Sequence, residues 1–449
     1  MKKITAQEIK TSVIEPGYCS GCGVCTASGA FRMQLNAHGQ YEPEMLDSEN
    51  TTDAVCPFAN HGLNEDDIAR AYFDKLSYHP SFGYYKNLYA GFVREGDYRK
   101  NGSSGGSITW FTDRLLREKK VDYVIHVKEN NQAEIRFQYA VSTDTSHNAE
   151  ASKSKYYPVT LEKALQYIQQ HEGQYAVVGL PCFLKGINLL KKTDELFAQR
   201  IKYTISLFCG HLKTTHYLSS IIAQFNIDEK QVKHFDFRHK LPGHKASDYA
   251  TKILTHDGKE LIKTNKDLFG TNWGWGLFKL KACDYCDDLV GETADISFGD
   301  AWIPRYENDY AGTNMVVTRN DELDDLIKRH IQKGNLQYDS VSPEELIAGQ
   351  AGGFRHRHEG LAYRLYLQQK KGEPVPEKRV KPATIKSKKR RKLYKIRMQL
   401  QEKSMASQNY INIPALKKEL MPLIKKLEKN YTHSPWTRFR LKLKKWLKK

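Results

Sequence analysis

Short apolar runs and segments with a helical period alternate between residue 88 and residue 225. The apolar runs, which have the length of strands buried in a sheet, stand at 88–94, 121–127, 175–181 and 205–209. Segments whose apolar residues recur every three or four positions, as on a helix with one buried face, stand at 107–119, 161–170 and 216–225. This alternation predicts an α/β or α+β body.

The two ends of the chain have other patterns. Residues 1–62 are rich in Gly, Cys, Asp and Asn and show little period, which indicates a small loop-rich module; a helix is expected next, at 65–76. Residues 371–392 are rich in Pro, Lys and Arg and are typical of a linker, and a helix is expected at 412–430. We therefore divide the chain into 1–62, two parts of one body at 80–160 and 161–370, and a C-terminal extension at 371–449.

Composition bears on where the protein works. The chain has 449 residues, 40% of them hydrophobic, but no run approaches the roughly 18–20 apolar residues of a membrane-spanning helix. The N-terminal sequence MKKITAQEIKTSVIEPG has no apolar stretch behind its lysines and does not resemble a secretory signal. We therefore expect a cytoplasmic protein, in which closely spaced cysteines more often bind metal or take part in catalysis than form disulfides.

The positive charge is concentrated in the C-terminal extension. Residues 371–449 hold 25 Lys/Arg and 5 Asp/Glu, a formal charge of +20, against +18 for the whole chain. Within 436–449 one helical face collects Trp436, Phe439, Leu443, Trp446 and Leu447, and Lys and Arg fill the other. This pattern is typical of a helix lying on an anionic membrane, so we expect peripheral contact with the inner face of the membrane through 431–449. A helix that docks on a partner, nonspecific nucleic-acid binding and a solvated basic tail are the alternatives; no specific nucleic acid is expected.

The first four of the eight cysteines have the spacing of iron–sulfur ligands. Cys19, Cys22 and Cys25 form a C-x2-C-x2-C run, and Cys56 stands directly before Pro57. Bacterial ferredoxins continue this run to a nearby fourth cysteine that serves another cluster, and that continuation is missing here. We expect a ferredoxin-like module in which these four cysteines hold one 4Fe-4S cluster. A structural zinc site is the alternative, although zinc more often uses paired C-x2-C knuckles.

The other four cysteines are Cys182, Cys209, Cys283 and Cys286. Cys182 and Cys209 each follow an apolar strand, where we expect them to enter a loop, and Cys283 and Cys286 form a C-x2-C pair. Their spacing leaves two interpretations open. The four side chains share a metal site, or they are small buried side chains at the ends of strands.

The turn Asn101-Gly102-Ser103-Ser104-Gly105-Gly106 precedes the helix expected at 107–119. Glycines let a ligand approach the backbone, and the free amides at a helix N-terminus favour an anion such as a pyrophosphate. The same turn is also an ordinary capping loop. Arg238 and Lys240, in FRHKLPG, are suited to clamping an anion, or to a surface ion pair.

Several segments together resemble one family. They are NGSSGGSITWFTDRLL, GLPCFLKGI, LFCGH, FDFRHKLPG, and CDYCDDL followed by ADISFGDAW. By these segments the chain is identified, over residues 15–320, as a member of the coenzyme F420 hydrogenase/dehydrogenase beta subunit family, whose relatives include hydroxymethyl-chlorophyll a reductase. The resemblance implies an α+β iron–sulfur flavoprotein that binds FAD beside its clusters. It also implies that Cys182, Cys209, Cys283 and Cys286 ligate a second 4Fe-4S cluster.

The resemblance also implies which residues contact FAD. They are Asn101, Ser103, Ser104, Gly105, Gly106, Arg238 and Lys240. The family continues the basic pair with Gly-Trp, whereas Gly243 is followed here by His244, which puts an aromatic contact at that point in doubt. Asp295, Asp300 and Trp302 are expected to shape the cofactor neighbourhood or to support a buried strand and turn.

These expectations combine into an oxidoreductase. Clusters move single electrons, whereas a flavin stores two and can transfer a hydride. We expect a ferredoxin-like donor to supply electrons through two clusters to FAD and then to a substrate, with an association to cell-envelope polysaccharide metabolism. The alternatives are an electron-transfer subunit that serves a partner enzyme, and a nonredox metal-stabilised binding protein, for example for RNA.

Overall fold

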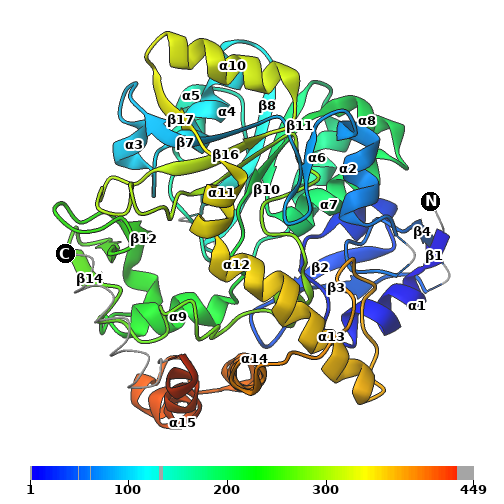
Figure 1. Cartoon of the computed structure of the whole chain (residues 1–449), viewed down its shortest axis with the longest axis vertical. Coiled ribbons are helices and arrows are strands. Elements are labelled where there is room, and N and C mark those ends of the chain that lie inside the picture. Colours follow the sequence, from blue (N-terminus) through cyan, green and yellow to red (C-terminus); the bar gives the residue numbers. More distant parts are fainter. Residues whose placement is uncertain (1–2, 49, 61, 131–134, 432–449) are drawn as a thin grey trace.

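The computed structural model describes residues 3–48, 50–60, 62–130 and 135–431, so the helix predicted at 436–449 lies outside the described residues. At the centre is an eight-stranded sheet in the order β17-β7-β16-β15-β11-β10-β8-β9 (Figure 1). Its strands are β7 (Asn87–Val93), β8 (Tyr123–Glu129), β9 (Phe137–Ser142), β10 (Tyr175–Gly179), β11 (Ile201–Leu207), β15 (Ile296–Asp300), β16 (Asn314–Thr318) and β17 (Leu336–Ser340). The sheet joins the two predicted parts of the body, because β7–β9 come from 80–160 and the others from 161–370.

Five of these strands run in the same direction. β8, β10, β11 and β15 are paired in parallel, and β7 runs with them because antiparallel β16 lies between β7 and β15. β9 and β17 close the two edges as antiparallel strands. The carboxyl ends of the five strands therefore meet at one edge, the position at which open α/β sheets bind ligands. Mixed parallel and antiparallel pairing confirms the predicted α+β class.

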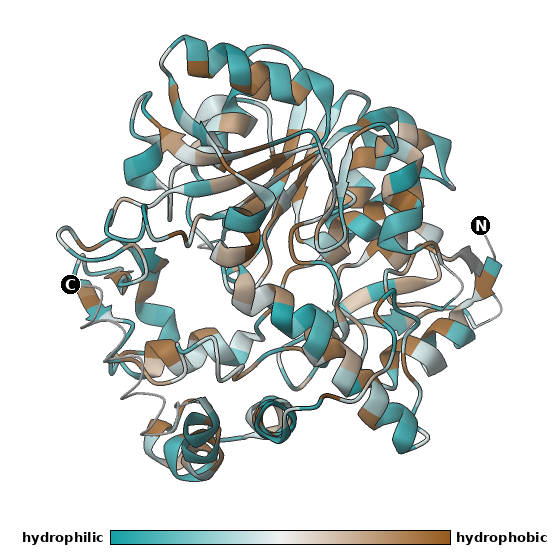
Figure 2. Cartoon of the chain, viewed as in Figure 1, coloured by the Kyte–Doolittle hydropathy of each residue, from teal (hydrophilic) through white to brown (hydrophobic). Residues whose placement is uncertain are grey.

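Helices cover both faces of the sheet, and the hydrophobic residues are concentrated along its strands (Figure 2). One face packs on α4 (Ser107–Arg117) and α10 (Asp321–Gln332), whose buried residues include Trp110 and Leu326. The other face packs on α6 (Glu162–Gln170), α7 (Pro181–Lys191) and α8 (Glu195–Arg200). The helical periods at 107–119 and 161–170 thus come from one-sided burial of α4 and α6.

A smaller antiparallel sheet stands beside the carboxyl edge. It consists of β12 (Val232–His239), β13 (Ala250–Thr255) and β14 (Glu260–Thr264), and α9 (Thr215–Ala223) packs with it. The chain then continues, after β17, through α11 (Pro343–Gly349), α12 (Ala351–Arg355) and α13 (Leu361–Lys370).

The N-terminal module is built from small elements around the first cysteines. They are β1 (Lys3–Thr5), α1 (Ala6–Ile9), β2 (Phe31–Leu35), β3 (Tyr41–Met45) and β4 (Thr51–Asp53), followed by α2 (Glu65–Phe73), β5 (Ser77–His79) and β6 (Gly83–Tyr85). The module shares a hydrophobic cluster with the body, in which Tyr18 and Phe58 pack near Tyr285 and Leu361. It is therefore attached to the body by a buried interface.

The C-terminal extension differs from the linker predicted at 371–392. Residues 374–383, which we call the strap, lie against both the module and the body. Tyr18 donates a hydrogen bond to the Pro374 carbonyl (2.7 Å), and the Glu377 amide donates to Asn60 (2.8 Å). Buried ion pairs described below explain why this Lys- and Pro-rich segment is held in place. It leads to α14 (Lys388–Ala406) and to α15 (Ile413–Tyr431), which confirms the helix predicted at 412–430. Among the described residues, no helix has the length and apolarity to cross a bilayer.

Candidate functional site

The first cysteine set (Cys19, Cys22, Cys25 and Cys56) is formed mainly by one loop. Gly21 and Gly23 within this loop have φ values of +74° and +80°, which side-chain-bearing residues adopt only with strain. They turn the chain so tightly that the Gly21 amide donates to the sulfur of Cys19 at 3.3 Å. The local sequence therefore creates the curvature that gathers three of the four thiols.

The second cysteine set (Cys182, Cys209, Cys283 and Cys286) is assembled from distant segments. Cys209 stands two residues beyond β11, and Cys182 three residues beyond β10, at the carboxyl edge of the sheet. Cys283 and Cys286 come from the turn η4 (Lys281–Tyr285) and the residue after it. Cys182 was expected in a loop, but it lies in the first turn of α7, because Pro181 begins that helix directly after the strand.

All four thiols of the second set line one cavity. Its wall also includes Arg357 and Leu212, whose amide donates to the sulfur of Cys283 at 3.2 Å. Ser20 and Phe58, from the N-terminal module, line the same cavity. The two cysteine sets are therefore neighbours, and the Tyr18 and Tyr285 rings meet between their segments at 4.8 Å.

Burial raises the pKa of the thiols in both sets. Burial raises the pKa of all four thiols in the first set, and that of Cys22 reaches about 12. Repulsion from the other thiolates adds to the rise at Cys19, Cys22 and Cys25, but not at Cys56. Burial likewise raises the pKa of Cys283 to about 11. Bound iron removes this penalty, because a coordinating thiol is deprotonated by the metal.

No three His, Cys, Asp or Glu side chains in the described part of the chain surround one point closely enough to hold a single metal ion. A 4Fe-4S cluster does not require such a point, because each of its four cysteines binds a different iron. The metal group that the two cysteine sets hold stays a prediction.

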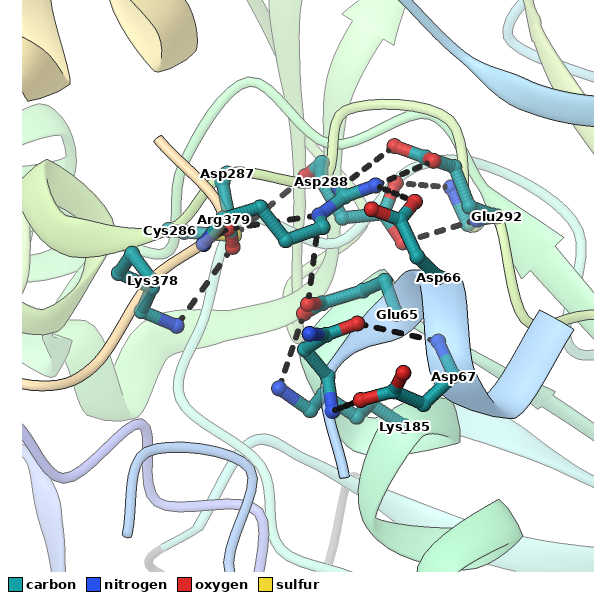
Figure 3. A network of polar contacts seen from close by, with 12 residues as sticks. Glu65, Asp66, Asp67, Lys185, Cys286, Asp287, Asp288, Glu292, Lys378 and Arg379 are labelled. Atoms are coloured by element: carbon teal, nitrogen blue, oxygen red, sulfur yellow. Dashed lines mark hydrogen bonds and ion pairs between the residues drawn. The ribbon is translucent and has the colours of Figure 1, made fainter. Parts of the chain in front are cut away.

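A buried network of charges lies beside Cys286 (Figure 3). Asp287, which follows that cysteine, pairs with Lys378 of the strap at 3.5 Å. Arg379 of the strap reaches Glu292 with two hydrogen bonds of 2.8 and 2.9 Å and Asp66 with one of 2.8 Å. The strap therefore neutralises carboxylates from two segments, the loop that follows Cys286 and the helix α2.

Burial in this network changes the pKa of Glu292. Its side chain is 3% exposed, and burial raises its pKa to about 7 although Arg379 opposes the rise. On the α2 side, Glu65 pairs with Lys185 of α7 at 3.2 Å. Removing one partner from such a network leaves an uncompensated buried charge, which is the costly case.

The Ser/Gly turn lies at the same carboxyl edge as the second cysteine set. Ser104 donates to the Thr313 carbonyl at 3.0 Å, and the Ser103 hydroxyl accepts from the Ser154 amide at 2.8 Å. A Cβ on Gly106, whose φ is +81°, would meet the Tyr98 carbonyl at 2.5 Å. The close approach at Gly106 is therefore to the protein's own backbone. Contact of this turn with FAD remains a prediction.

A Cβ on Gly105 would likewise meet the Gly91 carbonyl and the Asn314 side chain, both at 2.7 Å. Asn314 also accepts from the Ser107 amide at the start of α4 (3.2 Å), so part of the helix N-terminus already has a partner. Asn101 is exposed at the other end of the turn.

Both predicted basic residues reach this region. Lys240 donates to the Ser104 carbonyl at 2.8 Å and also to the Arg99 carbonyl. Burial lowers the pKa of Lys240 to about 7, and repulsion from Lys153 and Arg99 adds to the shift. An anion placed here would restore the charge of this lysine, which suits the predicted phosphate contact.

Arg238 is held by Asp300 at the end of β15, through bonds of 2.8 and 3.3 Å. Burial opposes the charge of Arg238, but Asp300 overcomes it and keeps the pKa raised. Its guanidinium also lies 4.9 Å from the Tyr249 ring and 5.8 Å from the Trp302 ring. Asp295 instead accepts from the amide and hydroxyl of Thr204, each at 2.8 Å, and supports the sheet.

Aromatic rings connect the basic pair with the second cysteine set. Trp273 packs on His211, two residues after Cys209, with ring centroids 4.3 Å apart. The Trp273 ring also packs edge-on against Tyr156, with ring centroids 4.7 Å apart, and Tyr156 interacts with Arg238. The predicted cluster and flavin regions therefore lie on one continuous path of contacts.

Sequence reasoning missed Arg357, Lys378 and Arg379, which surround the second cysteine set. Their neighbours in the sequence form no motif, and the composition of the strap is that of a linker. The one available signal was the excess of acidic residues in CDYCDDL and EDD, which implies basic partners elsewhere in the chain.

Two family models match the chain. Residues 88–166 match the family model for the N-terminal part of the coenzyme F420 hydrogenase/dehydrogenase beta subunit, and residues 172–344 match the model for its C-terminal part. Together the two models cover more than half of the chain.

Two similar proteins come from Methanocaldococcus jannaschii. In an alignment of 310 positions, which covers 64% of this chain and 43% of the relative, the chain is 24% identical to a coenzyme F420-dependent sulfite reductase. In an alignment of 250 positions, which covers 54% of this chain and 62% of the relative, it is 25% identical to an uncharacterised protein. The chain thus spans about half the length of these curated relatives.

Among solved structures, one similar chain belongs to the F420-reducing [NiFe] hydrogenase complex from Methanosarcina barkeri. The TM-score is 0.50 at 16% identity, over 65% of this chain and 96% of that chain. This likeness concerns the fold.

Proposed function

Because the chain belongs to the coenzyme F420 hydrogenase/dehydrogenase beta subunit family, we propose that it is an FAD- and 4Fe-4S-dependent oxidoreductase. The first cysteine set holds one 4Fe-4S cluster and the second set holds another. Electrons enter from a ferredoxin-like donor at the first set, pass the second set and reach FAD, which reduces the substrate. The flavin supplies the change from one-electron to two-electron chemistry.

The single observation that carries this proposal is the adjacency of two complete four-cysteine sets. Ser20 and Phe58 belong to the segments of the first set and line the cavity of the second. Adjacent cofactors can exchange electrons inside one chain. The aromatic contacts through Trp273 and Tyr156 then lead from Cys209 toward Arg238.

The residues of the carboxyl edge have distinct tasks in this proposal. Lys240 and the turn from Asn101 to Gly106 bind the phosphates of FAD, and Asp300 orients Arg238. Arg238 then presents a fixed cation to the flavin or to an anionic substrate. Partly buried rings such as Trp302 limit the access of water to this region.

Anaerobic purification and cofactor analysis test the proposal. We expect about eight irons and one FAD per chain, and about four irons in Cys22→Ser or Cys283→Ser. A wild-type protein with four irons contradicts the two-cluster proposal, and a protein without FAD contradicts the mechanism. Zinc in place of iron gives a protein that lacks the brown colour of an iron–sulfur cluster.

A second candidate function is an electron-transfer subunit for a partner enzyme. The similar solved chain, of which 96% is covered, comes from a hydrogenase complex, which favours this candidate. Turnover by the isolated chain with an artificial donor separates the two functions. The membrane contact proposed for 431–449 is tested apart from both, by vesicle sedimentation with and without that segment.

A further inference from the structure

Arg357 stands inside the second cysteine set. It is 2% exposed and lines the cavity together with Cys182, Cys209, Cys283 and Cys286. It belongs to the π-helical turn His356–Gly360, between α12 and α13, a local geometry that is frequent at functional sites. It also lies beyond residue 344, where the match to the family ends.

The hydrogen bonds of the Arg357 guanidinium go to carbonyl oxygens. Its Nε donates to the Asp288 carbonyl at 2.9 Å, and one terminal nitrogen donates to the carbonyls of Gly210 and Cys209, the former at 3.1 Å. The Asp288 carboxylate is occupied by backbone amides, including that of Gly291 at 2.8 Å. The positive charge of Arg357 therefore lies against the cysteine loops, and no carboxylate of the described residues is bonded to it.

The first cysteine set has different surroundings. The charged groups around Cys19, Cys22 and Cys25 are chiefly the other cysteines, with Glu42 near Cys19. Lys185 and Lys378 act on Cys56, at the margin of that set. The second set has a buried cation among its four cysteines, Arg357, which acts on Cys286 and Cys209 together with the buried Asp288.

We propose that Arg357 tunes the second cysteine set, raising the reduction potential of the cluster held there above that of the first. This inference rests on the proposed function. Reduction adds one electron to the cluster, and a buried cation stabilises the added negative charge strongly because the surroundings have a low dielectric constant. Electrons then run downhill from the first set toward the second, and onward to the flavin region.

Redox titration of the anaerobic holoenzyme, followed by electron paramagnetic resonance, measures this effect. The signal of the second cluster is identified as the one that changes in Cys209→Ser. In wild type we expect it to titrate at the higher potential. Arg357→Met is expected to lower the equilibrium constant for one-electron reduction of the second cluster at least tenfold, which shifts its reduction potential down by 59 mV. The signal of the first cluster is expected to stay in place.

Arg319→Met is the matched control. Arg319 is also 2% exposed, and it likewise bonds backbone carbonyls, those of Tyr84 (2.7 Å) and Ala294 (3.1 Å), but it does not line the cavity. Its replacement is expected to cost stability while leaving both potentials unchanged. If Arg357→Met also leaves both potentials unchanged, Arg357 has only a structural role and the inference is wrong.

Iron analysis separates this inference from the proposed function. A wild type with four irons overturns the two-cluster proposal, whereas eight irons with an unmoved potential overturns only the role of Arg357. If Arg357→Met loses iron, Arg357→Lys and Arg357→Gln decide the question, because they keep and remove the charge. The inference requires the lysine variant to retain a potential near wild type and the glutamine variant to fall below it.

Discussion

The two cysteine sets are assembled by opposite routes. The first depends mainly on one loop, in which Gly21 and Gly23 provide the curvature that a C-x2-C-x2-C run needs. The second depends on the whole body, since its members follow β10 and β11 or come from η4. A local site can be recognised from its spacing, whereas an assembled site exists only when the fold exists. The two sets should therefore respond differently to the same kind of damage.

The largest difference is expected between Cys283→Ser and Cys22→Ser. Each variant should lose about half of its iron, about four per chain. Cys283→Ser should also lower the Tm of the body by more than about 5 °C, because the second site ties together segments that are distant in sequence. Cys22→Ser should leave that Tm nearly unchanged. Calorimetry with iron analysis measures both, and equal losses of Tm would remove the distinction.

Breaking the strap should affect the second set without touching a cysteine. Arg379→Ala leaves Glu292 and Asp66 without their bonded cation, which costs about 3 kcal/mol in the free energy of unfolding. Burial already raises the pKa of Glu292 to about 7, and loss of Arg379 raises it further. Protonation relieves the unpaired charge, so the loss should be greater at pH 8 than at pH 6.

Denaturant unfolding at the two pH values measures this effect. Arg305→Ala is the control, because Arg305 forms an exposed pair with Glu345 (3.2 Å, side chain 45% exposed) that is worth little. A loss that is the same at pH 6 and pH 8 contradicts the assigned role of Glu292.

The Ser/Gly turn depends both on its own sequence and on the fold. Its glycines set its backbone conformation, whereas the residues that pack against it come partly from distant segments of the chain. Gly106→Ala places a Cβ at a φ of +81° and 2.5 Å from the Tyr98 carbonyl, which should cost about 2 kcal/mol or more and reduce the bound FAD. Gly334→Ala is the matched control, with a φ of +77° and open space around its Cβ, and should cost only about 1 kcal/mol. Thermal unfolding and flavin fluorescence compare them; equal losses would show that the contact with Tyr98 is unimportant.

The smallest effect is expected at Lys240. Lys240→Met should weaken FAD binding about tenfold, the size of one charge-assisted hydrogen bond. In wild type, the affinity should fall as the pH rises above about 7, because Lys240 then loses its proton in the free protein. Titration of the apoprotein with FAD at pH 6 and pH 8.5 measures the slope. Lys240→Met should abolish it, and an identical slope in that variant would exclude Lys240 as its source.

The sequence predicted those features whose causes are close together in the chain. The helix at 107–119 and the strands at 121–127 and 175–181 were found because burial imposes their periods locally. The lysine and arginine of the strap could not be found, because their partners lie about 90 and 310 residues away at Asp287 and Asp66. Composition classified that segment as a linker, although its charges are matched to a buried acidic network.

The second cysteine set was recognised by resemblance, since Cys182 and Cys209 alone resemble any small residue at the end of a strand. Neither spacing nor resemblance indicated Arg357, which reaches the site from a helix turn about 70 residues after Cys286. An arginine in an irregular helical segment has no signature in one sequence. The environment of Arg357 depends on the folded structure, in which the loops whose carbonyls accept its hydrogen bonds lie next to each other.

The strap also has a consequence for how the protein is made. Translation delivers all eight cysteines before residues 374–383 leave the ribosome, so the acidic loop after Cys286 is synthesised well ahead of Lys378 and Arg379. A nascent chain therefore passes through a stage in which the second site is open to iron–sulfur delivery. Closure of the strap ends that stage. Chains that stop before residue 378 should therefore take up iron but lose it to a chelator faster than the full chain does, because no strap closes the site.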